Sequence, residues 1–305
     1  MSSLRERLEG GEVFVTDGAT GSRLFAEVRK AGVRYADELV LKNPIAVSEL
    51  EKGYIDSGTT LLLTCTFNGN MAKMGPCGYS QEKVIGLNQE AVRIARGLAG
   101  ERLVAGDIGP TGLFPKLYEP ESGVTPQTLK NAFTPQVIGL TRNTDGENGI
   151  DLILLETFDD LTELGIAVDI VKRLAPHMPI AASMNFSRLK SSDRSLHTLM
   201  GVGAKELADF VIAKNLCVQG ANCGYGPEGF VNLLKKIGTG NPDASLWGKP
   251  NVGRPTADFA VNLSDEEIRT VTQQLLDAGA QCVGWCCGSN QRYIEITASV
   301  VAQRT

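Results

Sequence analysis

The feature that most constrains the fold is a pattern that recurs eight times along the chain. A short apolar, β-branched run ends in Gly, Asn, Asp or Thr, and a helical pattern follows it. The strand-like runs cover residues 13–17, 60–66, 103–108, 152–157, 180–186, 218–223, 246–252 and 282–286. Strands that alternate with helices pair in parallel through right-handed crossovers. Eight such units in this length predict an α/β fold, a (β/α)8 TIM barrel, and a doubly wound open sheet is the competing arrangement.

The helix-like segments cover residues 44–57, 81–98, 125–148, 160–174, 205–215, 228–237, 264–278 and 291–302. Ser264 followed by Glu267 has the form of a helix-capping box. No low-complexity stretch, Pro-rich linker or long charge run divides the sequence, so we expect residues 1–305 to form a single barrel domain. The strand-to-helix loops at residues 67–80, 109–125 and 187–203 are long, and in a barrel they rise at the C-terminal face, where active sites lie.

The overall charge limits the kinds of partner. A net charge of −5 and an isoelectric point of about 5.3 argue against nucleic acid or an anionic membrane, since both bind basic surfaces. The chain has no run of about 18 apolar residues, and residues 1–11 are polar and charged, unlike a signal peptide. We therefore expect a cytoplasmic protein. In a reducing compartment the seven cysteines are not expected to form a disulfide framework.

Three cysteines fall where predicted strands give way to loops: Cys223 after the sixth strand, and Cys286-Cys287 after the eighth. In a closed barrel alternate strands contribute to the same layer, so both strand ends can reach one point. Three thiolates suit Zn²⁺ and leave a fourth position open, as in catalytic zinc sites. A small thiol in that position would lose its proton and could attack a methyl carbon. Core packing and a vicinal redox pair are the alternatives for Cys286-Cys287.

Asn222-Cys223 followed by Gly226-Pro227, with Cys286-Cys287-Gly288 later in the chain, resembles the cysteine motifs of the homocysteine S-methyltransferase family. This family includes the homocysteine-binding module of cobalamin-dependent methionine synthase and betaine–homocysteine methyltransferase. Residues 16–21, 64–67, 106–112 and 151–157 also resemble family segments, in the same order along nearly the whole chain. The resemblance implies a (β/α)8 barrel, a zinc site of three cysteines, and homocysteine as the methyl acceptor, which would give methionine.

The same resemblance implies roles for individual residues. The zinc ligands would be Cys223, Cys286 and Cys287. Glu156 would bind the amino group of the substrate, and the loop at Asp17 and Gly18 would bind its carboxylate through backbone N–H groups. Asn222 is included in this substrate-binding set. A buried carboxylate needs a partner, which suits Glu156; a salt bridge to a local Lys or Arg is its alternative role, and a turn or cap is that of Asp17.

The chain departs from the family at Trp285, because family members commonly have Gly-Gly before Cys-Cys and this chain has Gly284-Trp285. A large ring beside the ligands would narrow the pocket, alter the acceptor, or point outward into packing. The sequence leaves these three alternatives open.

The methyl donor is the least constrained part of the function. Family members take methyl groups from methylcobalamin, betaine, S-methylmethionine or related sulfonium donors. The Asp-x-His-x-x-Gly pattern that carries cobalamin in corrinoid proteins does not occur here. The donor would therefore be a separate corrinoid protein or a free small molecule. A cationic donor would favour an aromatic cage, and the candidates by residue type are Tyr79, Phe114, Tyr118 and Trp285.

Other functions stay open at this stage. One is zinc-dependent methyl transfer between a different thiol or methylated donor and a separate corrinoid protein. Another is a metal-free thiol redox protein that uses the Cys286-Cys287 pair. A third is a barrel that binds a corrinoid protein without turnover. Core packing is the expected role of the cysteines outside the zinc set that fall on or beside strands, namely Cys65, Cys217 and Cys282.

Overall fold

The computed structural model describes residues 4–113, 123–142, 149–189, 195–224, 226–227, 229–253 and 262–304. Eight parallel strands form one sheet in the order β1-β10-β9-β8-β5-β4-β3-β2. A parallel bridge between Thr16 and Leu61, with a 2.8 Å hydrogen bond from Thr60 N to Val15 O, joins the two ends of that order. The sheet is a nearly closed barrel, which confirms the predicted fold over the open sheet. The strands are β1 (Phe14–Val15), β2 (Leu61–Leu63), β3 (Leu103–Ile108), β4 (Leu152–Phe158), β5 (Ile180–Met184), β8 (Val218–Cys223), β9 (Ser245–Pro250) and β10 (Ala280–Val283).

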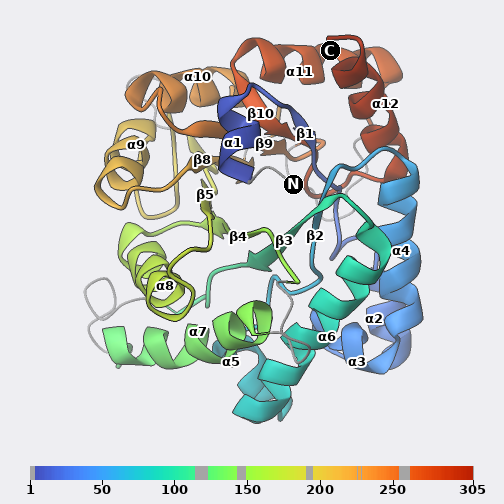
Figure 1. Ribbon diagram of the computed structural model, residues 1–305, viewed down its shortest axis with the longest axis vertical. Helices are drawn as coiled ribbons and strands as arrows, with labels where there is room; N and C mark the ends of the chain where they lie inside the picture. Colours follow the sequence, from blue (N-terminus) through green and yellow to red (C-terminus); the bar gives the residue numbers. More distant parts are fainter. Residues whose placement is uncertain are drawn as a thin grey trace.

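Helices surround these strands (Figure 1). The predicted capping box is present, because Ser264 Oγ accepts a hydrogen bond from Glu267 N while Glu267 Oε2 accepts one of 2.7 Å from Ser264 N. Among the helices of the described ranges, none is both long and apolar enough to cross a membrane. One longer helix follows each strand: α4 (Pro44–Asp56), α6 (Gln81–Ala99), α7 (Pro126–Thr141), α8 (Leu161–Leu174), α9 (Ala204–Ala213), α10 (Phe230–Gly240), α11 (Asp265–Asp277) and α12 (Gln291–Ala302).

Shorter elements that the sequence did not predict occupy the segments between these strands and helices. Elements of two to seven residues are too short to show a strand or helix period. The expected helix at residues 125–148 ends at Thr141, and residues 143–148 lie outside the described part. The short elements are α1 (Leu4–Glu9), α2 (Phe25–Ala31), α3 (Leu39–Lys42), α5 (Met71–Met74), two 3-10 helices (Ala36–Glu38 and Gly75–Cys77), and the antiparallel pair β6 (Arg188–Leu189) and β7 (Leu196–His197).

Each strand has one face inside the barrel and one face under the helices, because successive side chains on a strand point to opposite sides. On β4, Leu152 and Leu154 belong to the apolar cluster inside the barrel, whereas Ile153 and Leu155 belong to the cluster under the helices. The next interior position after Leu154 is Glu156. Alternation therefore turns a carboxylate inward at the carboxyl end of this strand.

Among the buried carboxylates outside the barrel strands is Glu51, on α4. Glu51 is 5% exposed, and neither of its carboxylate oxygens has a hydrogen-bond partner in the described part of the chain. Burial raises the pKa of Glu51 well above its ordinary value, and the charge of Asp17 raises it further. A group whose pKa is raised in the folded state stabilises the fold below its unfolded pKa, and this stability is lost as the pH rises toward the folded pKa.

We expect Glu51→Met to stabilise the protein, because methionine has a similar length and no charge to bury. The gain in the free energy of unfolding should be about 1–3 kcal/mol at pH 7.5 and smaller at pH 5. Urea denaturation at the two pH values measures it. Glu49→Met is the matched control, since Glu49 is exposed on the same helix. Equal gains at both pH values would show that Glu51 does not titrate with folding.

Candidate active site

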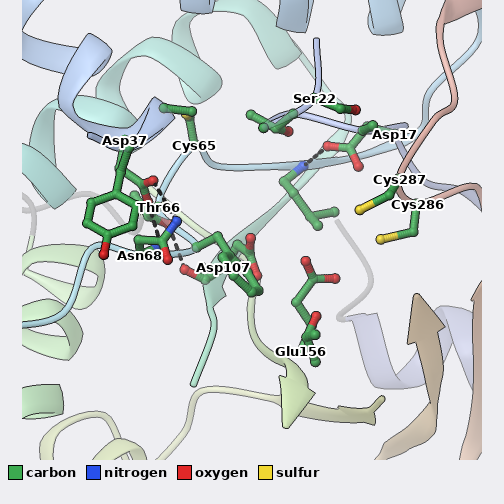
Figure 2. Close-up of a pocket in the computed structure, with 18 of the residues that line it drawn as sticks. Asp17, Ser22, Asp37, Cys65, Thr66, Asn68, Asp107, Glu156, Cys286 and Cys287 are labelled. Atoms are coloured by element: carbon green, nitrogen blue, oxygen red, sulfur yellow. Dashed lines mark hydrogen bonds between the residues drawn. The ribbon is translucent and has the colours of Figure 1, made fainter. Parts of the chain in front are cut away.

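A cavity of about 440 Å³ opens at the carboxyl ends of the strands (Figure 2). Ligand sites of barrel enzymes lie at this face. Alternation along the strands supplies its charged lining: Asp107 follows interior Ala105 on β3, and Lys249 follows interior Trp247 on β9. The predicted residues that line the cavity are Asp17, Gly18, Glu156, Cys223, Cys286 and Cys287.

The three cysteines meet at one side of the cavity. Their Sγ atoms all lie within 4.8 Å of one another, and the Sγ atoms of Cys223 and Cys287 are 3.9 Å apart. Cys223 and Cys286 are paired as a disulfide, with their Cα atoms 5.4 Å apart. The sulfurs joined here therefore come from two strands, and the vicinal pair Cys286-Cys287 is not the one that is bonded. The convergence expected from the sixth and eighth strand ends is present.

Asn251, just after β9, forms hydrogen bonds to both segments that carry the cysteines. Its Oδ1 accepts a 3.1 Å hydrogen bond from Cys287 N, and its Nδ2 donates a 3.2 Å bond to Gly224 O. Asn251 is buried, with only 3% of its surface exposed. Cys223 has a positive φ of 55°. Gly224 has one of 69°, and a Cβ atom at Gly224 would lie 2.8 Å from the backbone of Phe186. Asn251 was not predicted as part of the site.

The carboxylate of Asp17 accepts hydrogen bonds from two groups within the protein. Its Oδ1 accepts a 2.8 Å hydrogen bond from Lys249 Nζ, and its Oδ2 accepts a 2.9 Å bond from Leu63 N. Both side chains of the Asp17–Lys249 pair are 3% exposed. Burial alone would lower the pKa of Lys249, but Asp17 and Glu156 together raise it, so Lys249 stays an ammonium at neutral pH. Lys249 lines the cavity and was not predicted as part of the site.

Two further carboxylates, Glu156 and Asp107, project into the cavity (Figure 2). Glu156 Oε2 and Asp107 Oδ1 are buried without a hydrogen-bond partner in the described ranges. Burial is the main cause that raises the pKa of each group, with the charge of Asp17 adding to it for Glu156. Glu156 does not form the local salt bridge that was its alternative role, within the part of the chain described. Buried acceptors of this kind call for a cationic or hydrogen-bonding ligand.

The loop after β1 is fixed by two side chains. Tyr54 donates a 2.6 Å hydrogen bond to Ala19 O, and Ser289 Oγ accepts a 3.0 Å bond from Ala19 N. Ser289 Oγ also donates to Cys286 O at 2.8 Å, which ties this loop to the cysteine segment. A side chain at Gly18 would meet Tyr54 at 2.8 Å and Ser289 at 2.9 Å, so only glycine fits there.

Asn222 positions the neighbouring strand end. Its Oδ1 accepts hydrogen bonds of 2.9 Å from Thr157 N and 2.7 Å from Ser183 Oγ, and its Nδ2 donates a 2.6 Å bond to Thr157 Oγ1. Thr157 has a positive φ of 66°, and this unusual conformation directly follows Glu156. Asn222 is fully buried and does not line the cavity, so its direct contact with substrate stays a prediction.

Trp285 points away from the cavity. Its Nε1 donates a 2.9 Å hydrogen bond to Thr297 Oγ1 on α12, and its ring packs edge-on against Tyr293 at a centroid distance of 5.2 Å. The residue is fully buried in the layer under the helices. Of the three alternatives for this departure from the family, the structure selects outward packing.

Other predicted residues have mixed outcomes. Cys65 and Cys282 are buried as expected, although Cys65 also touches the cavity, and Cys217 is partly buried. Neither Tyr79 nor Trp285 lines the cavity, and Phe114 and Tyr118 lie outside the described residues. Aromatic side chains that line it come instead from the segments that follow β1 and β2, namely Phe25, Tyr35 and Phe67.

Fold and site together define a barrel enzyme with three cysteine sulfurs beside an acidic cavity. A family profile described as homocysteine S-methyltransferase matches residues 14–301, and the chain belongs to this family. Members of the family are methyltransferases with a thiol acceptor, and this is the enzyme class of the chain.

The chain is 26% identical over 313 residues to methionine synthase of Mycobacterium tuberculosis (strain ATCC 25618 / H37Rv), covering 95% of this chain and 25% of that protein. It is 26% identical over 325 residues to betaine–homocysteine S-methyltransferase 1 of Mus musculus, covering 97% and 74%. The oxidized form of the homocysteine methyltransferase MmuM from Escherichia coli superposes with a TM-score of 0.74 and 20% identity over 100% of both chains. The chain thus spans a quarter of the methionine synthase that it matches.

We expect Trp285→Phe to lower the free energy of unfolding by about 1–3 kcal/mol, because it removes the hydrogen bond to Thr297 and part of the ring packing. The choice of thiol substrate should not change, since the ring is turned away from the cavity. Urea denaturation and a thiol competition assay measure the two properties. Unchanged stability combined with altered thiol preference would place the ring at the active site instead.

Proposed function

We propose that this protein is a zinc-dependent S-methyltransferase that activates homocysteine as a thiolate and methylates it to methionine. Cys223, Cys286 and Cys287 are the zinc ligands in this proposal. The observation that carries it is that three sulfurs from two strand ends lie together beside a cavity. In the described ranges, Glu156 and Asp107 in this cavity each have a carboxylate oxygen without a hydrogen-bond partner. The chain's membership of the homocysteine S-methyltransferase family supports the same acceptor.

The donor set fits zinc. Thiolate sulfur is a preferred ligand of Zn²⁺, and three of them leave the fourth tetrahedral position for a substrate. The Sγ atoms of Cys223 and Cys287 are 3.9 Å apart and those of all three cysteines lie within 4.8 Å of one another, so one ion could contact all three. A disulfide offers no thiolate, so the Cys223–Cys286 pair must be reduced before the metal can bind.

When bound, zinc would supply the positive charge that keeps a substrate thiol deprotonated at neutral pH. The residues of the chain orient the substrate. Glu156 accepts hydrogen bonds from the substrate ammonium, and the fixed loop at Asp17 and Gly18 presents backbone N–H groups to its carboxylate. The sulfur then attacks the methyl carbon, and the bond from that carbon to the donor breaks with its electron pair remaining on the donor. The thiol proton passes to solvent.

The methyl donor is a separate corrinoid protein or a free small molecule. The match to a quarter of methionine synthase favours a barrel that works with a methyl-carrying partner outside this chain. The same observation motivates the second candidate, methyl transfer between another thiol or methylated donor and a corrinoid protein. A single barrel domain over residues 1–305 and a cytoplasmic location also stay predictions.

We expect purified, reduced protein to contain about one zinc ion per chain, and Cys223→Ser, Cys286→Ser and Cys287→Ser each to lose most of it together with activity. Loss of one of three thiolates removes a strong ligand and leaves two. Elemental analysis measures the metal, and homocysteine with methylcobalamin, betaine or S-methylmethionine measures turnover. Cys77→Ser is the matched control, because Cys77 is partly exposed and does not line the cavity.

Two results would contradict the proposal. The first is folded wild-type protein that neither contains nor takes up zinc under reducing conditions. The second is full methylation of homocysteine by a serine variant. Zinc binding combined with methylation of a different thiol would favour the second candidate.

A further inference from the structure

Buried polar atoms without hydrogen-bond partners in the described ranges lie on two facing sides of the cavity. Figure 2 shows Ser22 beside Asp17 on one side, Asp107 and Glu156 on the facing side, and the sulfurs of Cys286 and Cys287 between the two sides. Ser22 Oγ is buried without a partner in the described ranges, as are Glu156 Oε2 and Asp107 Oδ1. A ligand that satisfies both sides carries an acceptor group at one end and a cationic donor group at the other.

Lys249 lies on the same side as Asp17, because its Nζ is bound to Asp17 Oδ1. An ammonium has three N–H bonds. Only one of them has a hydrogen-bond acceptor in the described part of the chain, although Lys249 is 3% exposed and lines the cavity. Two donors of a buried cation are therefore free to bind a ligand in the cavity, and Asp17 fixes the direction of the side chain.

We infer that Lys249 binds the α-carboxylate of the thiol substrate and makes the site selective for thiols that are α-amino acids. The inference deepens the proposed function and rests on it. Glu156 and Asp107 face this contact and receive the substrate ammonium. The substrate is then held at three points, by its carboxylate, its ammonium and its sulfur, which fixes the sulfur for attack on the methyl carbon.

A purely structural role for Lys249 makes a different prediction. Four carboxylates line the cavity, those of Asp17, Asp37, Asp107 and Glu156, and Lys249 could serve only to reduce the repulsion among Asp17, Asp107 and Glu156. Such a role affects all thiols alike. A carboxylate contact instead affects only those thiols that have a carboxylate, so a comparison of substrates separates the two roles.

The test measures, by calorimetry, the binding of homocysteine and of 3-mercaptopropylamine, which lacks only the carboxylate, to zinc-loaded, reduced protein. We expect wild-type protein to bind homocysteine about 10- to 100-fold more tightly than the amine, as a charge-assisted contact provides. Lys249→Met should reduce this preference at least about tenfold, and any remaining preference comes from the backbone N–H groups of the loop at Asp17 and Gly18. Its preference for homocysteine over 4-mercaptobutanoate, which lacks the amino group, should stay as in wild type.

Lys249→Gln gives the same comparison if methionine at this buried position prevents folding. Lys130→Met is the control, since Lys130 is exposed on α7. Equal weakening of both thiols, an unchanged preference, or no binding of homocysteine by wild type would overturn the inference. The assay contains no methyl donor, so a protein that shows the expected preference but never methylates homocysteine would contradict the proposed function alone.

Discussion

The arrangement of the site depends on the parallel pairing of β9 with β8 on one side and β10 on the other. This pairing brings the carboxyl ends of β8 and β10 to the same rim, one strand apart, so that Cys223 approaches Cys286 and Cys287. Asn251 completes the arrangement, because one buried amide bonds to both cysteine segments. Barrel closure through Thr16 and Leu61 then brings the loop at Asp17 to the same place.

The second determinant is the two-residue alternation of the strands. Below the cavity the interior positions are apolar, and at the carboxyl ends they become Asp107, Glu156 and Lys249. Burying these charges is costly unless they are paired. The Asp17–Lys249 pair compensates for part of this cost, while Glu156 Oε2 and Asp107 Oδ1 have no hydrogen-bond partner among the residues that the structure describes. A cationic group of a ligand would offset the remaining cost of burying Glu156 and Asp107. The ammonium of an amino-acid thiol is such a group.

Much of this could be predicted from the sequence. The eight strand-like runs and the helices that follow them predicted the barrel correctly, because the hydrophobic period of a long segment identifies its secondary structure. The three motif cysteines, Gly18 and Glu156 were predicted as site residues, and all of them line the cavity. Lys249, Asp107 and Asn251 were missed, since a single charged or amide residue at a strand end has no motif. Alternation was the available signal: Trp247 faces inward, so Lys249 must as well.

The same rule would have settled Trp285. Cys282 is interior and Val283 faces the helices, so Gly284 turns inward toward Thr16 and Trp285 turns outward. By contrast, the hydrogen bonds of Asn222 to Thr157 and Ser183 join three strands, and sequence spacing carries no information on such contacts.

The most direct test of the central claim is zinc-edge X-ray absorption on reduced, zinc-loaded protein with and without selenohomocysteine. We expect three sulfur neighbours in the free protein and one added selenium neighbour when the compound is bound. Zinc whose neighbours do not change on binding, or binding of the compound to protein that holds no metal, would contradict it.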